Sequence, residues 1–113
     1  MHHSHAAALD ATITMLAELA VSGGARRGDT IEVYRLAREI RADAAIFGLK
    51  DITRAAHSLC ELMASNRPAQ QLWQGIAVHV QAIIALRQPA GDAAGTRTPM
   101  LEGLERISRS PPR

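Results

Sequence analysis

The stretch "YRLAREIRADAAIFGL", residues 34–49, decides the fold because its apolar residues recur at the period of an α-helix. The buried stripe of this helix is predicted to consist of Val33, Leu36, Ala37, Ile40, Ala44 and Phe47. Asp29 is expected to cap its start, because Glu32 follows at the spacing of a capping box. Gly48 suits the position just after a helix, where the backbone often turns left-handed. The stretch therefore predicts one amphipathic helix with one buried face.

Three further segments have the same helical period, at about residues 5–21, 49–65 and 68–87. Ser4 is a candidate cap for the first of them. No segment shows the alternation or the β-branched runs that predict a strand. Amphipathic helices of similar length joined by short breaks are typical of an all-α, up-down four-helix bundle. We predict that this bundle spans residues 1–88.

Residues 89–113 differ in composition and are predicted to form a flexible C-terminal extension. The stretch "PAGDAAGTRTP" resembles a linker, because it is rich in proline, glycine and alanine. A short helix is expected after it, with Thr98 as its cap, Pro99 as its first residue, and an apolar face. That face consists of Met100, Leu104 and Ile107. Three outcomes remain open for this helix: docking on the bundle, contact with a partner, or no stable helix. The final "SRSPPR" is expected to be disordered.

The composition excludes several classes of function. The chain has 113 residues, enough for one domain, and Cys60 is its single cysteine, so no internal disulfide and no cysteine-built metal site is expected. The net charge is +2 and the arginines are dispersed, which argues against a nucleic-acid partner. No run of about 18 apolar residues predicts a membrane span. We expect a cytoplasmic protein without a cofactor.

The outer face of the helix at residues 34–49 is unusual, because small and apolar residues replace the expected long charged side chains. When the buried stripe faces the core, Arg38 points almost directly outward. The candidate binding residues of this face are Tyr34, Arg35, Arg38, Arg41, Ala42, Ala45 and Ile46. An ordinary solvated helix face and a docking surface are both compatible with this pattern.

The motif on this helix resembles that of histidine phosphotransfer (HPt) domains, which is roughly A-H-x-[IL]-[KR]-G-x-A-x-x-[FL]-G. The chain has "AREIRADAAIFG" at residues 37–48, which matches at Ile40, Arg41, Ala44, Phe47 and Gly48. The following "LKDITRAAHSLCEL" is similar to the third helix of such domains in α-proteobacteria. The resemblance covers residues 6–88. It implies a four-helix bundle of the bacterial two-component phosphorelays, in which HPt domains carry phosphoryl groups between receiver domains.

Two positions depart from the family motif. Arg38 stands where the family has its phosphorylated histidine, and Ala42 replaces the glycine one turn later. A guanidinium stays protonated and has no free lone pair, so Arg38 cannot accept a phosphoryl group as an imidazole does. The resemblance therefore implies a module without enzymatic activity that docks a response-regulator receiver domain or a histidine kinase through the Arg38 face.

Other residues leave alternatives open. His57 is a candidate displaced phosphoacceptor in an active phosphotransfer protein, or a surface histidine without a role. A further alternative is that the outer face forms the seam of a homodimer, through Tyr34, Ala42, Ala45 and Ile46. His79 is expected to be partly buried and bonded to a neighbouring helix. The histidines near the N-terminus, His2, His3 and His5, form either a divalent-metal site or an incidental cluster.

Overall fold

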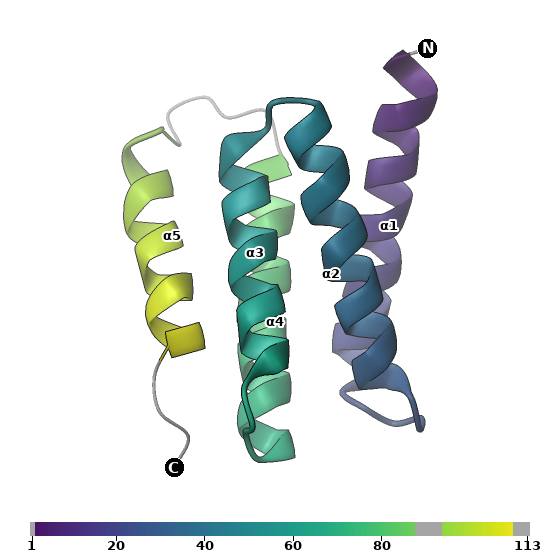
Figure 1. Ribbon diagram of the computed structural model, residues 1–113, viewed down its shortest axis with the longest axis vertical. Coiled ribbons are helices and arrows are strands. Elements are labelled where there is room, and N and C mark those ends of the chain that lie inside the picture. The colour runs from purple at the N-terminus through teal and green to yellow at the C-terminus, as the bar shows by residue number, and fades with distance from the viewer. Residues whose placement is uncertain (1, 88–93, 110–113) are drawn as a thin grey trace.

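The computed structural model describes residues 2–87 and 94–109, with side chains at 7–87 and 99–109. Its five helices are α1 (His2–Ser22), α2 (Asp29–Ile46), α3 (Lys50–Ala64), α4 (Ala69–Arg87) and α5 (Ala94–Arg109). Successive helices run in alternating directions (Figure 1). The described part of the chain is thus all-helical, as predicted, and contains no strand. None of these helices is long and apolar enough to cross a membrane.

The core lies where α1, α2, α3 and α4 meet, because α1 and α3 each pack against both α2 and α4. The predicted stripe of α2 faces this core, and Val33, Leu36 and Ile40 are fully buried there. The other helices contribute the buried leucines and isoleucines Leu9, Leu16, Leu59, Ile76 and Ile83. Burying each such side chain contributes about 1.5–3 kcal/mol, so the helix-period stripes supply much of the driving force for folding.

The turn between α2 and α3 forms as predicted. Gly48 adopts a left-handed backbone with φ of 71°, which glycine tolerates without a steric cost. Its N–H donates to the carbonyl of Ala45, and the N–H of Leu49 donates to the carbonyl of Ala44 at 2.8 Å. These two bonds satisfy carbonyls at the end of α2 in the Schellman arrangement. The tight turn brings α2 and α3 together as antiparallel neighbours.

The predicted caps at two helix starts are wrong. Gly28 precedes α2 and no side chain caps the helix, whereas Asp29 is its first residue. The Asp29 Oδ2 instead accepts the backbone N–H of Arg26 at 3.0 Å, so the carboxylate tightens the preceding loop. Glu32 cannot reach back as a capping box requires, because its carboxylate is bound to Arg35. Ser4 lies inside α1, which begins at His2.

The C-terminal segment forms a longer helix than predicted, and this helix docks. Thr98 and Pro99, expected to begin it, lie inside α5, and "SRSPPR" starts within its last turn. Residues 88–93 and 110–113 lie outside the described residues. Leu101 and Leu104 are each only 2% exposed and join the main core, with α5 packed on α3 and α4. Of the three outcomes left open, docking on the other helices is the one observed.

A chain of polar contacts ties α5 to α3 and α4. The Ser58 hydroxyl of α3 lies 3.2 Å from the Ser108 hydroxyl of α5 and 2.9 Å from Nε2 of His79 on α4. Arg54 also forms a two-bonded ion pair with Glu105 of α5, at 2.7 and 2.6 Å. Its guanidinium holds the pKa of the Glu105 carboxyl below its usual value. Because hydrogen bonds are directional, these contacts determine where α5 packs on α3 and α4.

His79 is fully buried, beyond the partial burial predicted for it, and it is bonded to a neighbouring helix as expected. Burial lowers its pKa, because the charged ring loses its solvation there, and the hydrogen bond to the carbonyl of Gly75 opposes this effect only in part. In the neutral form its Nδ1–H donates to the carbonyl of Gly75 at 2.7 Å, and Nε2 accepts the Ser58 hydroxyl. The neutral imidazole thus fits its two partners.

The lowered pKa of His79 makes the stability dependent on pH. The folded state disfavours the charged ring, so the stabilisation is complete above the ordinary histidine pKa and declines as the pH falls below it. We expect the free energy of unfolding to fall between about pH 7 and pH 5, by up to about 1.4 kcal/mol per pH unit. Urea denaturation across this range measures it. The variant His57→Gln should keep the decline and His79→Gln should lose it; a decline unchanged in His79→Gln would contradict the assignment.

Two helical glycines provide a matched test of the packing between α3, α4 and α5. A Cβ added at Gly75 of α4 would lie 2.7 Å from Cδ2 of the buried Leu62, whereas one added at Gly103 of α5 would meet nothing within 4 Å. Gly103→Ala should stabilise by about 1 kcal/mol through helix propensity. Gly75→Ala should lower the free energy of unfolding by about 1 kcal/mol, because the clash with Leu62 costs more than the helix propensity of alanine contributes. Equal stabilisation by both in urea denaturation would show that Gly75 is not tightly packed.

Candidate docking face on α2 and α3

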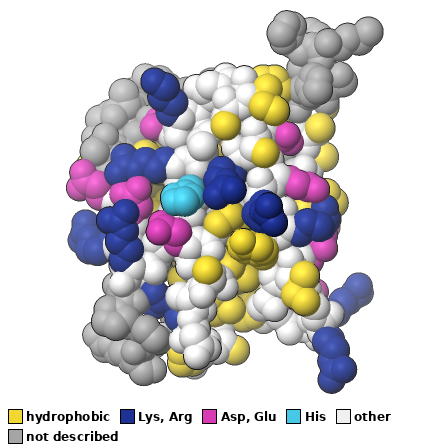
Figure 2. Space-filling model, viewed as in Figure 1, with side chains coloured by type: hydrophobic (Ala, Val, Ile, Leu, Met, Phe, Trp, Pro, Cys, Tyr) yellow, Lys and Arg dark blue, Asp and Glu magenta, His cyan; other side chains and the backbone are white. Residues whose placement is uncertain are grey.

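The structure places the predicted binding residues on the outer side of α2. Tyr34, Arg35, Arg38, Ala42, Ala45 and Ile46 are exposed, and Arg41 is half-buried. Ile46 is 79% exposed and lies beside the exposed Ala45 and Ala42. Figure 2 shows basic side chains gathered over α2 and α3, around a histidine and beside apolar side chains. The face therefore combines positive charge with apolar contact area.

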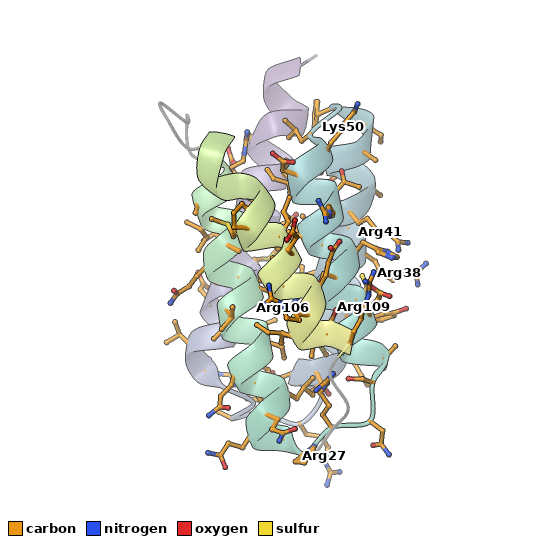
Figure 3. The ribbon with its side chains drawn as sticks, turned by 90° about the vertical axis from the view of Figure 1, so that its left-hand side faces the viewer. Arg27, Arg38, Arg41, Lys50, Arg106 and Arg109 are labelled. Carbon is orange, nitrogen blue, oxygen red and sulfur yellow. The ribbon has the colours of Figure 1, made fainter. Side chains whose placement is uncertain are left out.

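Arg38 is held over the ring of Tyr34, with its guanidinium carbon 5.7 Å from the ring centroid. This cation–π contact joins residues one helical turn apart and is worth about 0.5–1 kcal/mol at an exposed site. No carboxylate of the described residues lies within ion-pair distance of Arg38. Figure 3 shows Arg38 and Arg41 projecting on the same side of the molecule. The contact with Tyr34 thus holds the guanidinium of Arg38 in place, and its charge is free to pair with a group on another molecule.

Arg35 differs from its neighbours, although the sequence placed it in the same set. It forms ion pairs with Glu32 and Glu39, the acidic residues one turn before and after it. The hydrogen bond from Arg35 lowers the pKa of the Glu32 carboxyl. These pairs are exposed and stabilise α2 only slightly. The two carboxylates outweigh the single charge of Arg35, so this group adds no net positive charge to the face.

The fold brings His57 of α3 next to Arg41 of α2. Nη1 of Arg41 lies 3.3 Å from Nδ1 of His57, and Nε2 of His57 lies 3.8 Å from Oε1 of Glu61. The guanidinium can only donate, so Nδ1 accepts and the ring proton of neutral His57 is on Nε2. His57 and the α2 face, which the sequence presented as separate features, belong to one surface. We name this surface, made of the seven α2 residues and His57, the docking face.

A groove of about 480 Å³ lies where the docking face crosses from α2 to α3. Its lining consists of Arg41, Ala45, Gly48, Lys50, Thr53, Arg54 and His57. Sequence analysis missed Lys50, Thr53 and Arg54 as site residues. A signal was present, because Lys50, Arg54 and His57 follow one another at the spacing of one helix face.

Other reactive side chains do not contribute to this surface. Cys60 is only 7% exposed, and burial raises the pKa of its thiol, so the unreactive protonated form is favoured. Within the described residues, no three histidine, cysteine or acidic side chains are grouped to hold a metal ion. The side chains of His2, His3 and His5 lie outside the described set. Of the docking face, only His57 carries a nucleophilic nitrogen.

The contact between Arg41 and His57 can be tested by NMR. We expect ¹⁵N spectra at neutral pH to show His57 mainly with its proton on Nε2, because Arg41 donates to Nδ1. Arg41→Gln should shift the Nδ1 resonance of His57, whereas the exposed Arg27→Gln, which removes the same charge elsewhere, should not. A predominant Nδ1–H form in the unaltered chain would contradict the contact.

No protein-family model, curated protein or solved structure matches this chain. The likeness to HPt domains therefore stays a prediction based on residues 37–48 and the helix that follows them. We infer a function from the chemistry of the docking face.

Proposed function

We propose that this chain is a non-catalytic, HPt-like signalling module that docks a receiver domain of a bacterial two-component system. In this proposal α1 to α4 constitute the up-down four-helix bundle of that family, and α5 is an addition to it. The observation that carries the proposal is Arg38: an exposed guanidinium without an acidic partner in the described chain, at the position of the family's phosphorylated histidine.

The chemistry of Arg38 suits binding and excludes phosphoryl transfer through this position. Its protonated guanidinium offers several N–H donors in a planar fork, which pairs with carboxylates through two parallel hydrogen bonds. The resemblance to HPt domains implies that a receiver presents a cluster of carboxylates around its phosphorylatable aspartate. A guanidinium that arrives where phosphohistidine would arrive is complementary to this cluster.

The surroundings of Arg38 support a protein partner. Ala42 and Ala45 carry only methyl groups, so another molecule can approach the helix closely beside Arg38. Ile46 adds exposed apolar area, and Tyr34 adds an aromatic ring that already orders the guanidinium. Tyrosine and arginine are the residue types that most often dominate the energy of protein interfaces. An ordered arginine also loses less conformational entropy on binding.

Phosphotransfer through His57 is a second candidate, which the position of His57 favours. The ring is exposed on the same surface as Arg38, and Arg41 beside it could stabilise a phosphoryl group. For Nε2 to attack, the ring proton must be on Nδ1, so Arg41 has to turn away from Nδ1. As the N–P bond forms, the bond between the phosphoryl group and the receiver's aspartate breaks and the aspartate carboxylate leaves. Transfer of radioactive label from a phosphorylated receiver to this chain, lost in His57→Gln, would support this function over the docking role.

The docking proposal predicts the effect of reversing one charge. Arg38→Asp should weaken binding to a receiver domain from the same organism by at least about tenfold, because a charge-assisted hydrogen bond is worth about 1.5–3 kcal/mol. Isothermal titration calorimetry with Mg²⁺ present measures this. Arg27→Asp is the matched control, since Arg27 is exposed near the opposite end of the molecule from Lys50 (Figure 3).

Three outcomes would contradict the docking proposal. They are equal weakening by Arg38→Asp and Arg27→Asp, no change in either variant, and no binding by any receiver domain of the organism. If the mass of the isolated chain instead increases with concentration and Ile46→Asp prevents the increase, the face is the seam of a homodimer. Sedimentation analysis separates this case from docking without any partner.

A further inference from the structure

The groove between α2 and α3 has an apolar floor. Ala45 contributes a methyl group to this floor. The space above Gly48 is open, since a Cβ added there would meet nothing within 4 Å. The hydroxyl of Thr53 donates to the carbonyl of Leu49 at 2.9 Å, so it is already satisfied within its own helix. The floor therefore offers contact to an apolar group and no free hydroxyl.

Basic side chains from both helices surround this floor. Arg41 comes from α2, and Lys50, Arg54 and His57 follow along α3. Glu105 neutralises Arg54, whereas no carboxylate of the described residues lies within ion-pair distance of Arg41 or Lys50. Nη1 of Arg41 lies 3.3 Å from Nδ1 of His57 instead. Two of the rim cations, Arg41 and Lys50, thus have no ion-pair partner among the described residues.

We propose that the groove binds a small amphipathic oxyanion: a carboxylate or phosphate group on an apolar body of about one aromatic ring. Its volume of about 480 Å³ lies within the range of small-molecule sites. The anionic group pairs with the rim cations, and the apolar body covers Ala45 and Gly48. Arg38 does not line the groove, so this site exists whether or not the chain docks a receiver.

The binding geometry follows from the contacts of Arg41. Its N–H directed at Nδ1 of His57 is a donor to a neutral acceptor, and a charged oxygen is a stronger acceptor for the same group. Arg54 is held in place by its two bonds to Glu105, so its aliphatic stem forms a fixed wall. We therefore expect Arg41 to turn to the ligand while Arg54 stays in place.

The test is a titration of the full chain followed by ¹H–¹⁵N NMR. The two probes are 3-phenylpropionate and phenyl phosphate, which distinguish a carboxylate from a phosphate ligand. We expect saturable shifts at the lining residues with at least one probe, and weaker binding by about tenfold in both Arg41→Gln and Lys50→Gln. Arg27→Gln removes the same charge outside the groove and should leave the affinity unchanged. Ala45→Leu should abolish binding by filling the floor while all the rim cations remain.

Several results would overturn the proposal. Neutral 3-phenylpropanol binding as tightly as the anions would mean that the cations play no part. If inorganic phosphate bound as tightly as phenyl phosphate, the apolar floor would contribute nothing to the affinity. Shifts that do not saturate, or equal weakening by Arg27→Gln and Arg41→Gln, would indicate general attraction of anions. The lining positions are exposed or half-buried, and far-UV circular dichroism verifies that each variant is folded.

Discussion

The packing of α3 is the constraint on which the rest of the structure depends. This helix contacts α2, α4 and α5, and small residues such as Ala55, Ala56 and Ser58 allow the close approach. The exposed residues of α3 form a narrow stripe at successive turns of the helix: Lys50, Arg54, His57, Glu61 and Ala64. The exposed charged side chains and the exposed histidine of α3 lie on this stripe, which borders the outer face of α2, whereas Ser58 faces α4 and α5. The docking face and the groove are both consequences of that arrangement.

The helix periods allowed the core and the outer face of α2 to be predicted, because both are properties of single helices. The contact between Arg41 and His57 could not be predicted, since it depends on how α2 and α3 are rotated against each other. The docking of α5 was left open for a similar reason: Leu101 and Leu104 are buried only because α3 and α4 offer a matching surface. The proline and glycines around them also obscured the helical pattern. The apolar period of a helix shows which of its faces is buried, but the packing between helices decides which faces contact each other.

The two proposals share part of one surface. Arg41 and Ala45 belong to the docking face and also line the groove, whereas Arg38 belongs to the first alone and Lys50 to the second alone. A ligand in the groove would therefore compete with a partner for Arg41 without touching Arg38. Coupling of this kind needs no change of shape, because two molecules that require the same side chain exclude each other. If both proposals hold, a ligand bound in the groove should weaken the binding of a receiver domain.

The polar chain from His79 through Ser58 to Ser108 also has a consequence for how the protein is made. Ser58 and Ser108 are 50 positions apart, so α3 is synthesised well before the helix that completes its contacts. Until α5 arrives, the Ser58 hydroxyl and the apolar surface that receives Leu101 and Leu104 remain open to water. Vectorial synthesis thus leaves one flank of α3 uncovered until α5 has been made.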